Sequence, residues 1–204
     1  MLVSFLLIVY LLKKGNSMSN KKIILISFGL LVLLQLWTPA AMIWNREKVL
    51  KTGKTFKFRS APVDPNDPFR GKYIVLSFSE NGYENAEKTN WEPGETIYVQ
   101  LTTDSAGFAK IFSLHKVKPG KGIDFVKTTI NYINSDNSKT VFIDWPFERF
   151  YMEESKAYEA EQVYIKSAAD SNSLTYALVK VKNGDAVLEN VFINDKPIVS
   201  FIKK

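Results

Sequence analysis

The longest apolar stretch of the chain lies near its N-terminus and covers residues 23–44. It reads IILISFGLLVLLQLWTPAAMIW, which is 22 residues without a formal charge. At about 1.5 Å per residue, a helix of this length spans the roughly 30 Å hydrocarbon core of a bilayer. Trp37 and Trp44 fall where an interfacial aromatic belt is expected, and Pro39 is expected to kink or end the helix near the outer face. The pattern predicts a transmembrane anchor.

A cleaved signal peptide is the competing interpretation of this stretch. Thr38 and Pro39 followed by Ala40 and Ala41 form only a poor cleavage site, and the apolar run is longer than the usual signal-peptide core. The uncleaved anchor is therefore favoured.

A shorter apolar run, MLVSFLLIVYLL, opens the chain and has only 12 residues, too few to span a bilayer as a helix. The run MSNKK that begins at Met18 looks like a natural protein start, so residues 1–17 are interpreted as a start-site artefact. If they are translated, they are expected to lie in the membrane interface. Residues 1–22 together form the predicted cytoplasmic segment.

After residue 44 the pattern changes to short runs in which apolar and polar residues alternate. A polar connector over 45–53 leads to a run in which Phe56 and Phe58 share one face, as in a half-buried strand. Asn183-Gly184 lies between two such runs and is the preferred type I′ hairpin turn. The expected strands are 55–59, 72–79, 95–103, 107–117, 122–133, 140–144, 174–182 and 186–193, with an optional edge strand over 197–202.

One helix is expected over about 152–166, because Glu153 and Glu154 stand at its positive end and Lys166 at the other. The predicted fold class is one N-terminal transmembrane helix plus a β-dominated (α+β) extracytoplasmic domain over 54–204. Its sheet is expected to be mostly antiparallel, with about one helix.

The net charge of +6 comes mainly from lysines that precede the anchor. Lys13–Lys14 and Lys21–Lys22 supply four positive charges, whereas residues 45–204 hold 23 basic and 21 acidic residues. This near balance removes nucleic acid as an expected partner. The lysines at 21–22 place the N-terminus in the cytoplasm by the positive-inside rule, and the basic residues over 46–54 argue more weakly for the opposite orientation.

Cysteine is absent, and His115 is the single histidine. These counts exclude disulfides, a thiol nucleophile, thiolate metal sites and zinc sites built on several imidazoles. His115 lies in an alternating run and is interpreted as a hydrogen-bonded or exposed strand residue. No catalytic residue, metal site or cofactor is assigned, and the sequence favours a non-enzymatic protein.

The segment PVDPNDPFRG is the most unusual local feature of the soluble part. Its three prolines make it a stiff, non-helical loop that carries Asp64, Asp67 and Arg70 shortly before Tyr73. These side chains could form a rigid polar surface for a partner or an anionic group. The favoured alternative is structural, with the aspartates forming Asx turns and Arg70 paired to a carboxylate.

The densest group of charged residues lies over 148–161. Glu148, Glu154 and Glu161 could perform acid/base chemistry or bind a hard cation, with Arg149 and Tyr151 beside them. The favoured alternative is again structural, because acidic residues stabilise a helix N-terminus and Arg149 can neutralise a neighbour.

The run PVDPNDPFRGKYIVLSF resembles a family of bacterial membrane-anchored proteins named after its Gly-Asp-Tyr-x-x-Leu-x-Tyr motif. Gly71, Tyr73 and Leu76 match, whereas Lys72 replaces the Asp and Phe78 the final Tyr. The blocks ERFYMEESKAYEAEQ and LVKVKNGDAVLENVFINDKPI also resemble the family. The change to lysine reverses a charge, so a role that rests on that carboxylate is not expected here.

The resemblance implies a single-pass protein of the bacterial inner (cytoplasmic) membrane, with its domain in the periplasm or outside the cell. It implies no established biochemical activity, and a partner that is a multi-pass membrane protein. We therefore expect an interaction module that contacts the lipid bilayer through residues 23–44. The alternative is an extracytoplasmic hydrolase or small-ligand-binding protein that uses the Glu148–Glu161 carboxylates.

Overall fold

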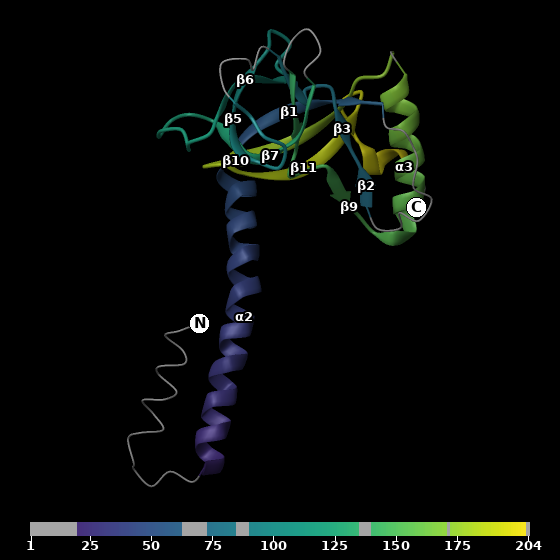
Figure 1. Cartoon of the computed structure of the whole chain (residues 1–204). Helices are drawn as coiled ribbons and strands as arrows, with labels where there is room; N and C mark the ends of the chain where they lie inside the picture. The colour runs from purple at the N-terminus through teal and green to yellow at the C-terminus, as the bar shows by residue number, and fades with distance from the viewer. Residues whose placement is uncertain (1–19, 63–72, 85–89, 135–139, 171, 203–204) are drawn as a thin grey trace. The chain divides into compact units, whose positions relative to one another are not determined.

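The structure, a computed structural model, describes residues 20–62, 73–84, 90–134, 140–170 and 172–202 (Figure 1). The chain divides into two compact units, residues 1–47 and residues 48–204. The first contains most of a long helix, and the second is a β-rich domain with one further α-helix.

Helix α2 (Asn20–Thr52) includes the whole predicted anchor. Within the part of the chain that the structure describes, it is the one helix long and apolar enough to cross a membrane. Most of its large apolar side chains up to Trp44 are exposed, from Leu30 at 44% to Trp44 at 77%. Exposed apolar surface on this scale marks a site of contact with a membrane or another protein.

The helix passes through Pro39, so of the kink or end expected there, the end is wrong. Proline removes one i→i−4 hydrogen bond, but the turns on either side keep theirs. Residues 45–52, expected to be a polar connector, are the last two turns of the same helix. It ends where the Gly53 N–H donates to the Val49 carbonyl at 2.7 Å.

The first five-stranded sheet is built on the C-terminal hairpin. Strands β10 (Thr175–Lys182) and β11 (Asp185–Ile193) pair through Asn183 and Gly184, whose φ angles of 54° and 99° suit the predicted type I′ turn. Gly184 also has no room for a side chain, since a Cβ would lie 2.8 Å from the Phe125 ring. The full order is β12 (Lys196–Pro197), β11, β10, β1 (Lys54–Ala61) and β3 (Ser77–Phe78).

The second five-stranded sheet contains the middle of the chain and is also antiparallel. Four of its strands confirm the expected runs, and the short β4 was not predicted. The order is β4 (Gly82–Tyr83), β8 (Thr140–Asp144), β7 (Phe125–Asn134), β5 (Thr96–Thr103) and β6 (Ala109–His115).

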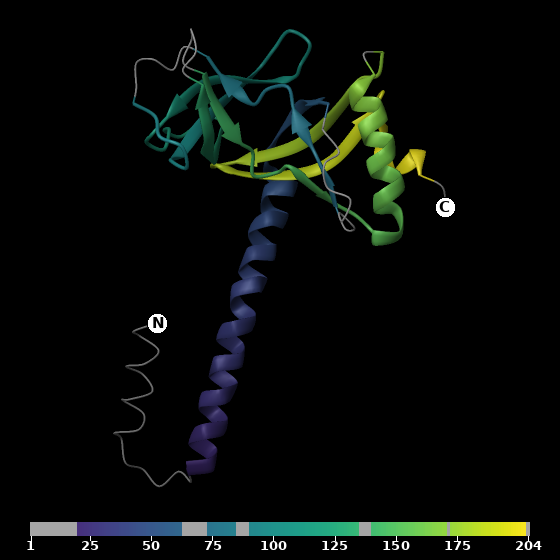
Figure 2. The ribbon, with the colours of Figure 1, turned by 45° about the vertical axis from the view of Figure 1, so that its right-hand side comes forward.

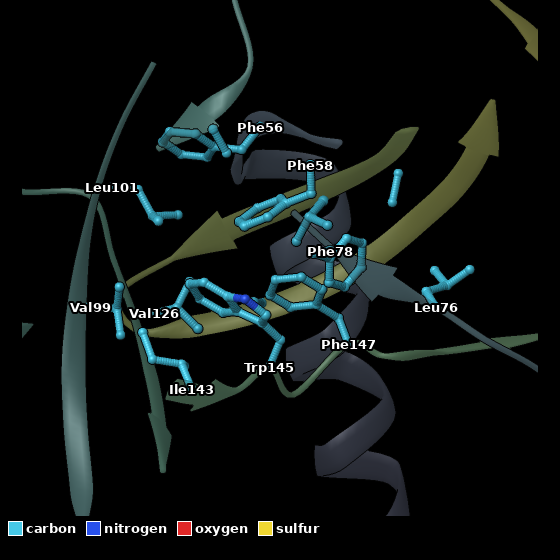
Figure 3. Packing of buried hydrophobic residues seen from close by; sticks show 14 of the residues in the cluster. Phe56, Phe58, Leu76, Phe78, Val99, Leu101, Val126, Ile143, Trp145 and Phe147 are labelled. Carbon is cyan, nitrogen blue, oxygen red and sulfur yellow. The ribbon is translucent and has the colours of Figure 1, made fainter. Parts of the chain in front are cut away.

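The core of the domain is a cluster in which aromatic rings of the first sheet and of the turn after β8 pack with aliphatic side chains of the second sheet (Figure 3). Phe58 of β1 is fully buried, with its ring 5.5 Å from Phe78, 5.2 Å from Trp145 and 4.9 Å from Phe147. The alternation predicted for β1 is confirmed, because Phe56 and Phe58 point inward while Lys57 and Arg59 are exposed.

The run 72–79, expected to be one strand, is two strands that serve different sheets. Strand β2 (Tyr73–Val75) pairs with β9 (Arg149–Tyr151), whereas β3 pairs with β1. Leu76 lies at the switch, and its N–H donates to the Glu148 carbonyl at 2.7 Å. The side chains of Leu76 and Phe78 stay in the core on either side of this change of partner, and each is 2% exposed.

Helix α3 (Glu154–Ala169) confirms the predicted helix and packs against β2 and the short 3-10 helix η2 (Ile198–Phe201), as Figure 2 shows. Of the optional edge strand over 197–202, only Pro197 lies in a strand, the two-residue edge strand β12. After Pro197 the chain turns into η2, where the Ser200 hydroxyl donates to the Pro197 carbonyl at 2.7 Å. Burial of Ile198 against the core favours this turn over an exposed edge.

Candidate functional site

The two-stranded ribbon β2–β9 brings together residues from the two regions that the sequence singled out. Its register pairs Tyr73 with Tyr151 and Val75 with Arg149. Directly opposed residues share one face of an antiparallel pair, so these four side chains lie on the same side. The pair between them, Ile74 and Phe150, points to the other side, where Ile74 is fully buried and Phe150 packs on the core.

Tyr73, Arg149 and Tyr151 form an aromatic and cationic cluster on the exposed face of the ribbon, named here the ribbon cluster. The two tyrosine rings lie 5.5 Å apart, and the Arg149 guanidinium lies 5.1 Å from the centre of the Tyr73 ring. Tyr151 is 65% exposed and Arg149 is exposed as well. A guanidinium over a tyrosine face is a favourable cation–π arrangement.

The residues around Arg149 stabilise its positively charged form. A hydrogen bond to Tyr151 raises the pKa of Arg149, and the nearby phenol groups act in the same direction. The guanidinium is therefore cationic at any physiological pH and retains donors for a partner, because its planar fork carries five N–H groups.

Strand β3, which follows the ribbon strand β2 after one residue, is tied to α3 by a buried tyrosine that the sequence patterns did not mark. Tyr164 of α3 is fully buried, and its hydroxyl accepts from the Ser77 N–H at 3.2 Å and lies 3.4 Å from the Ser77 carbonyl. Burial raises the pKa of Tyr164, so the phenol stays neutral. Its spacing from Ala157 and Ala160, both buried on α3, is the signal that could have marked it as inward-facing.

Glu148 directly precedes the ribbon, but its carboxyl group is used within the fold. Oε1 accepts from the Trp145 N–H at 3.3 Å. Burial raises the pKa of Glu148, Asp144 adds to the increase, and the Trp145 N–H and Arg149 oppose it. The carboxylate thus ties the turn after β8 to the start of β9.

We expect Glu148→Gln to stabilise the protein at pH 7 and to lose this advantage at acidic pH. The pKa of Glu148 is raised above 4.5 in the folded state, so the folded protein still holds the proton at pH values where the unfolded chain has lost it. The free energy of unfolding of the wild type therefore falls as the pH rises from about 4.5 through the folded-state pKa. Glutamine keeps the acceptor for Trp145 without a charge. Melting temperatures of both proteins at pH 7 and pH 4 test this, and a difference independent of pH would contradict it.

The other acidic candidates lie on α3. Glu154 is its first residue and is exposed, and Glu161 is partly exposed two turns later. Glu153 precedes the helix and forms an ion pair with Lys156 at 2.7 Å, which fits the expected role of acidic residues at a helix start. Among the described residues, no group of three or more His, Asp or Glu side chains could hold a metal ion.

Asp64, Asp67 and Arg70 lie outside the described residues, so the structure does not place them. In the sequence they lie between β1 and Tyr73, the first residue of β2.

His115 lies in β6, as the sequence predicted. Its Nε2 is 2.8 Å from the Ser113 hydroxyl and 3.2 Å from the Gln100 amide oxygen. In the described structure these partners are neutral, and the arrangement lacks the carboxylate that orients a catalytic histidine. It fits the hydrogen-bonded strand residue that was expected.

A surface depression of about 360 Å³ lies where β5, β7 and β8 meet. Sequence reasoning did not find it, because its lining comes from separate strands and carries no local motif. The lining residues are Thr96, Lys127, Thr128, Thr129, Asp144, Trp145 and Pro146.

These features define a class of protein, in which one apolar helix of membrane-spanning length precedes a β-rich domain with two antiparallel sheets. The family model described as GDYXXLXY protein matches residues 35–191, which is most of the chain. The chain therefore belongs to the GDYXXLXY family. No curated protein and no solved structure matches it.

The structure explains part of the motif that names the family. Tyr73 supplies one ring of the ribbon cluster, whereas Leu76 and Phe78 are buried on the core side of the same segment. The final position is phenylalanine in this chain, and a buried ring packed 5.4 Å from Phe147 has no need of a hydroxyl. Gly71 and Lys72 lie outside the described residues.

Proposed function

We propose that this protein is an interaction module held in the bacterial inner membrane by α2 and acting beside a multi-pass membrane protein. Its N-terminus lies in the cytoplasm and its β-rich domain lies outside. The exposed apolar surface of α2 supports the anchor, and Lys21 and Lys22 directly before the apolar run support the orientation.

The observation that carries the interaction role is the ribbon cluster. Tyrosine and arginine are the residue types that dominate binding energy at protein interfaces. Here Tyr151 is 65% exposed, yet its ring is held beside Tyr73 on paired strands. A pre-ordered aromatic surface loses little conformational entropy when a partner binds.

The test is crosslinking in native membranes followed by mass spectrometry of the captured proteins. We expect the double variant Arg149→Ala, Tyr151→Ala to lower capture of a multi-pass partner by about 30-fold or more, since the loss of even one interface hot spot costs about 2 kcal/mol or more. The matched control is Lys110→Ala, Tyr132→Ala on the second sheet, which removes one exposed base and one half-exposed tyrosine.

The control should capture the partner as wild type does. Equal capture by the ribbon variant would remove the ribbon cluster from the interface. Absence of any partner, together with substrate turnover by the purified protein, would overturn the interaction role as a whole.

The alternative of a hydrolase or small-ligand-binding protein rests on the raised pKa of Glu148, a property that a general acid requires. The hydrogen bond from Trp145 gives this carboxyl group a structural role, which weakens the case. If Glu148→Gln, Glu154→Gln and Glu161→Gln all leave every cellular phenotype intact, the alternative is excluded.

A further inference from the structure

Five lysines gather where the last turn of α2 meets the first sheet, and all of them belong to the second compact unit. Two come from the end of the helix, one from the start of β1 and two from the end of β10. Lys180 and Lys182 lie on one face of the sheet, where Lys180 is opposite Thr55. Lys54 is opposite Val181, so it lies at the same end of the two strands but on the other face. These residues, named here the junction lysines, are Lys48, Lys51, Lys54, Lys180 and Lys182.

The ammonium groups of Lys180 and Lys182 donate hydrogen bonds to neutral hydroxyl groups. The Lys182 ammonium donates to the Thr52 hydroxyl, which in turn donates to the Lys48 carbonyl at 2.6 Å. The Lys180 ammonium donates to the Thr55 hydroxyl at 2.7 Å. Hydroxyl partners position an ammonium group without neutralising it, so the positive charge stays available to an anion.

Ion pairs with carboxylates offset part of the charge. Lys54 lies 2.6 Å from Asp124, and Lys180 lies 3.5 Å from Glu189. Lys54 is exposed and its pair faces solvent, so these ion pairs are weak and can exchange partners. The helix dipole favours a lysine in the last helical turn and accounts for Lys51. The helix dipole does not account for the lysines of β1 and β10, which lie outside the helix.

The chain keeps the junction lysines close to the membrane if α2 is the anchor, a condition that rests on the proposed function. Lys48 follows Trp44, the end of the apolar run, by four residues. Four residues reach at most about 14 Å when extended and about 6 Å as helix. The headgroup layer is about 5–8 Å thick on each side, and charges interact over a Debye length of about 8 Å.

We propose that the junction lysines bind the phosphate headgroups of anionic phospholipids in the outer leaflet. Clusters of basic residues directly beside a transmembrane helix attract anionic lipids. The proposal also gives a role to the basic residues after the anchor, which oppose the orientation set by the positive-inside rule. Headgroup binding would orient the domain on the membrane as well as tether it.

The test compares lipids retained by the full chain in native mass spectrometry from micelles containing equal amounts of phosphatidylglycerol and phosphatidylcholine. One variant replaces three junction lysines and the control replaces three exposed lysines elsewhere, so that both lose the same charge. The junction variant is Lys48→Gln, Lys51→Gln, Lys182→Gln. The control variant is Lys110→Gln, Lys121→Gln, Lys166→Gln.

Wild type and control should retain phosphatidylglycerol in preference to phosphatidylcholine. In the junction variant this preference should fall by at least about fivefold, which is the contribution of one basic residue near an anionic surface. Equal preference in all three proteins, or loss in the control alone, would overturn the proposal. Displacement of the lipid by inorganic phosphate would show a phosphate site that is not specific for lipid and would also overturn it. Extraction of wild type from native membranes by alkaline carbonate would instead refute the anchor.

Discussion

Replacing Phe58 by alanine is expected to lower the free energy of unfolding by about 3–5 kcal/mol. The ring is fully buried and contacts Phe78, Trp145 and Phe147 at centroid distances of 5.5, 5.2 and 4.9 Å. Its removal leaves a cavity where segments of both sheets meet, and rigid neighbouring rings refill such a space poorly. A domain of this size is stabilised by only about 5–15 kcal/mol, so the loss is a large fraction of the total.

Urea unfolding of the full chain in micelles, followed by tryptophan fluorescence, measures this effect because Trp145 lies in the same cluster. The control is Tyr158→Ala, which removes an aromatic ring that is 71% exposed on α3. Its effect should stay within about 0.5 kcal/mol. A Phe58 variant as stable as the control would show that the ring cluster is not the centre of the core.

Replacing Leu33 and Leu34 together by arginine is expected to release the protein from the membrane. Leu, Ile, Val and Phe occupy 12 of the 22 positions in the anchor. At about 0.3–0.6 kcal/mol each they favour insertion by about 4–7 kcal/mol. Two arginines at the helix centre cost about 5–7 kcal/mol, and two leucines are lost as well. The balance therefore turns against insertion.

Alkaline carbonate extraction of membranes measures the release. Wild type and the control Leu33→Ala, Leu34→Ala should stay in the membrane fraction, because alanine shortens the side chains without adding charge. The arginine variant should move to the soluble fraction. If wild type is itself extracted, α2 does not act as an anchor, and its exposed apolar surface must be covered by protein.

The candidate site could be predicted only in pieces. Tyr73 was singled out through the proline-rich loop that precedes it, and Arg149 and Tyr151 through the charged region that follows β8. No local sequence pattern predicts that Tyr73 lies beside Arg149 and Tyr151, because it is more than 70 residues from them in the chain. The pairing of β2 with β9 makes Tyr73 and Tyr151 cross-strand neighbours.

The division of residues 72–79 into two strands could not be predicted from the local sequence either. The alternation of Ile74, Leu76 and Phe78 predicts one buried face, and all three residues are buried as expected. Alternation reports which side is buried, but not which strand lies alongside. The N–H of Leu76 bonds to Glu148 outside both ladders, and the strand changes partner there.

The sequence by itself determined the apolar helix, most of the strands, the C-terminal hairpin turn and the family of this protein. These features depend on the side chains of neighbouring residues, whose periodicity, length and turn preferences act locally. Strand order, the switch at Leu76, the ribbon cluster and the gathering of the junction lysines were decided only by the tertiary structure. They depend on pairing between distant segments, and the free energy of that pairing is set by the whole core.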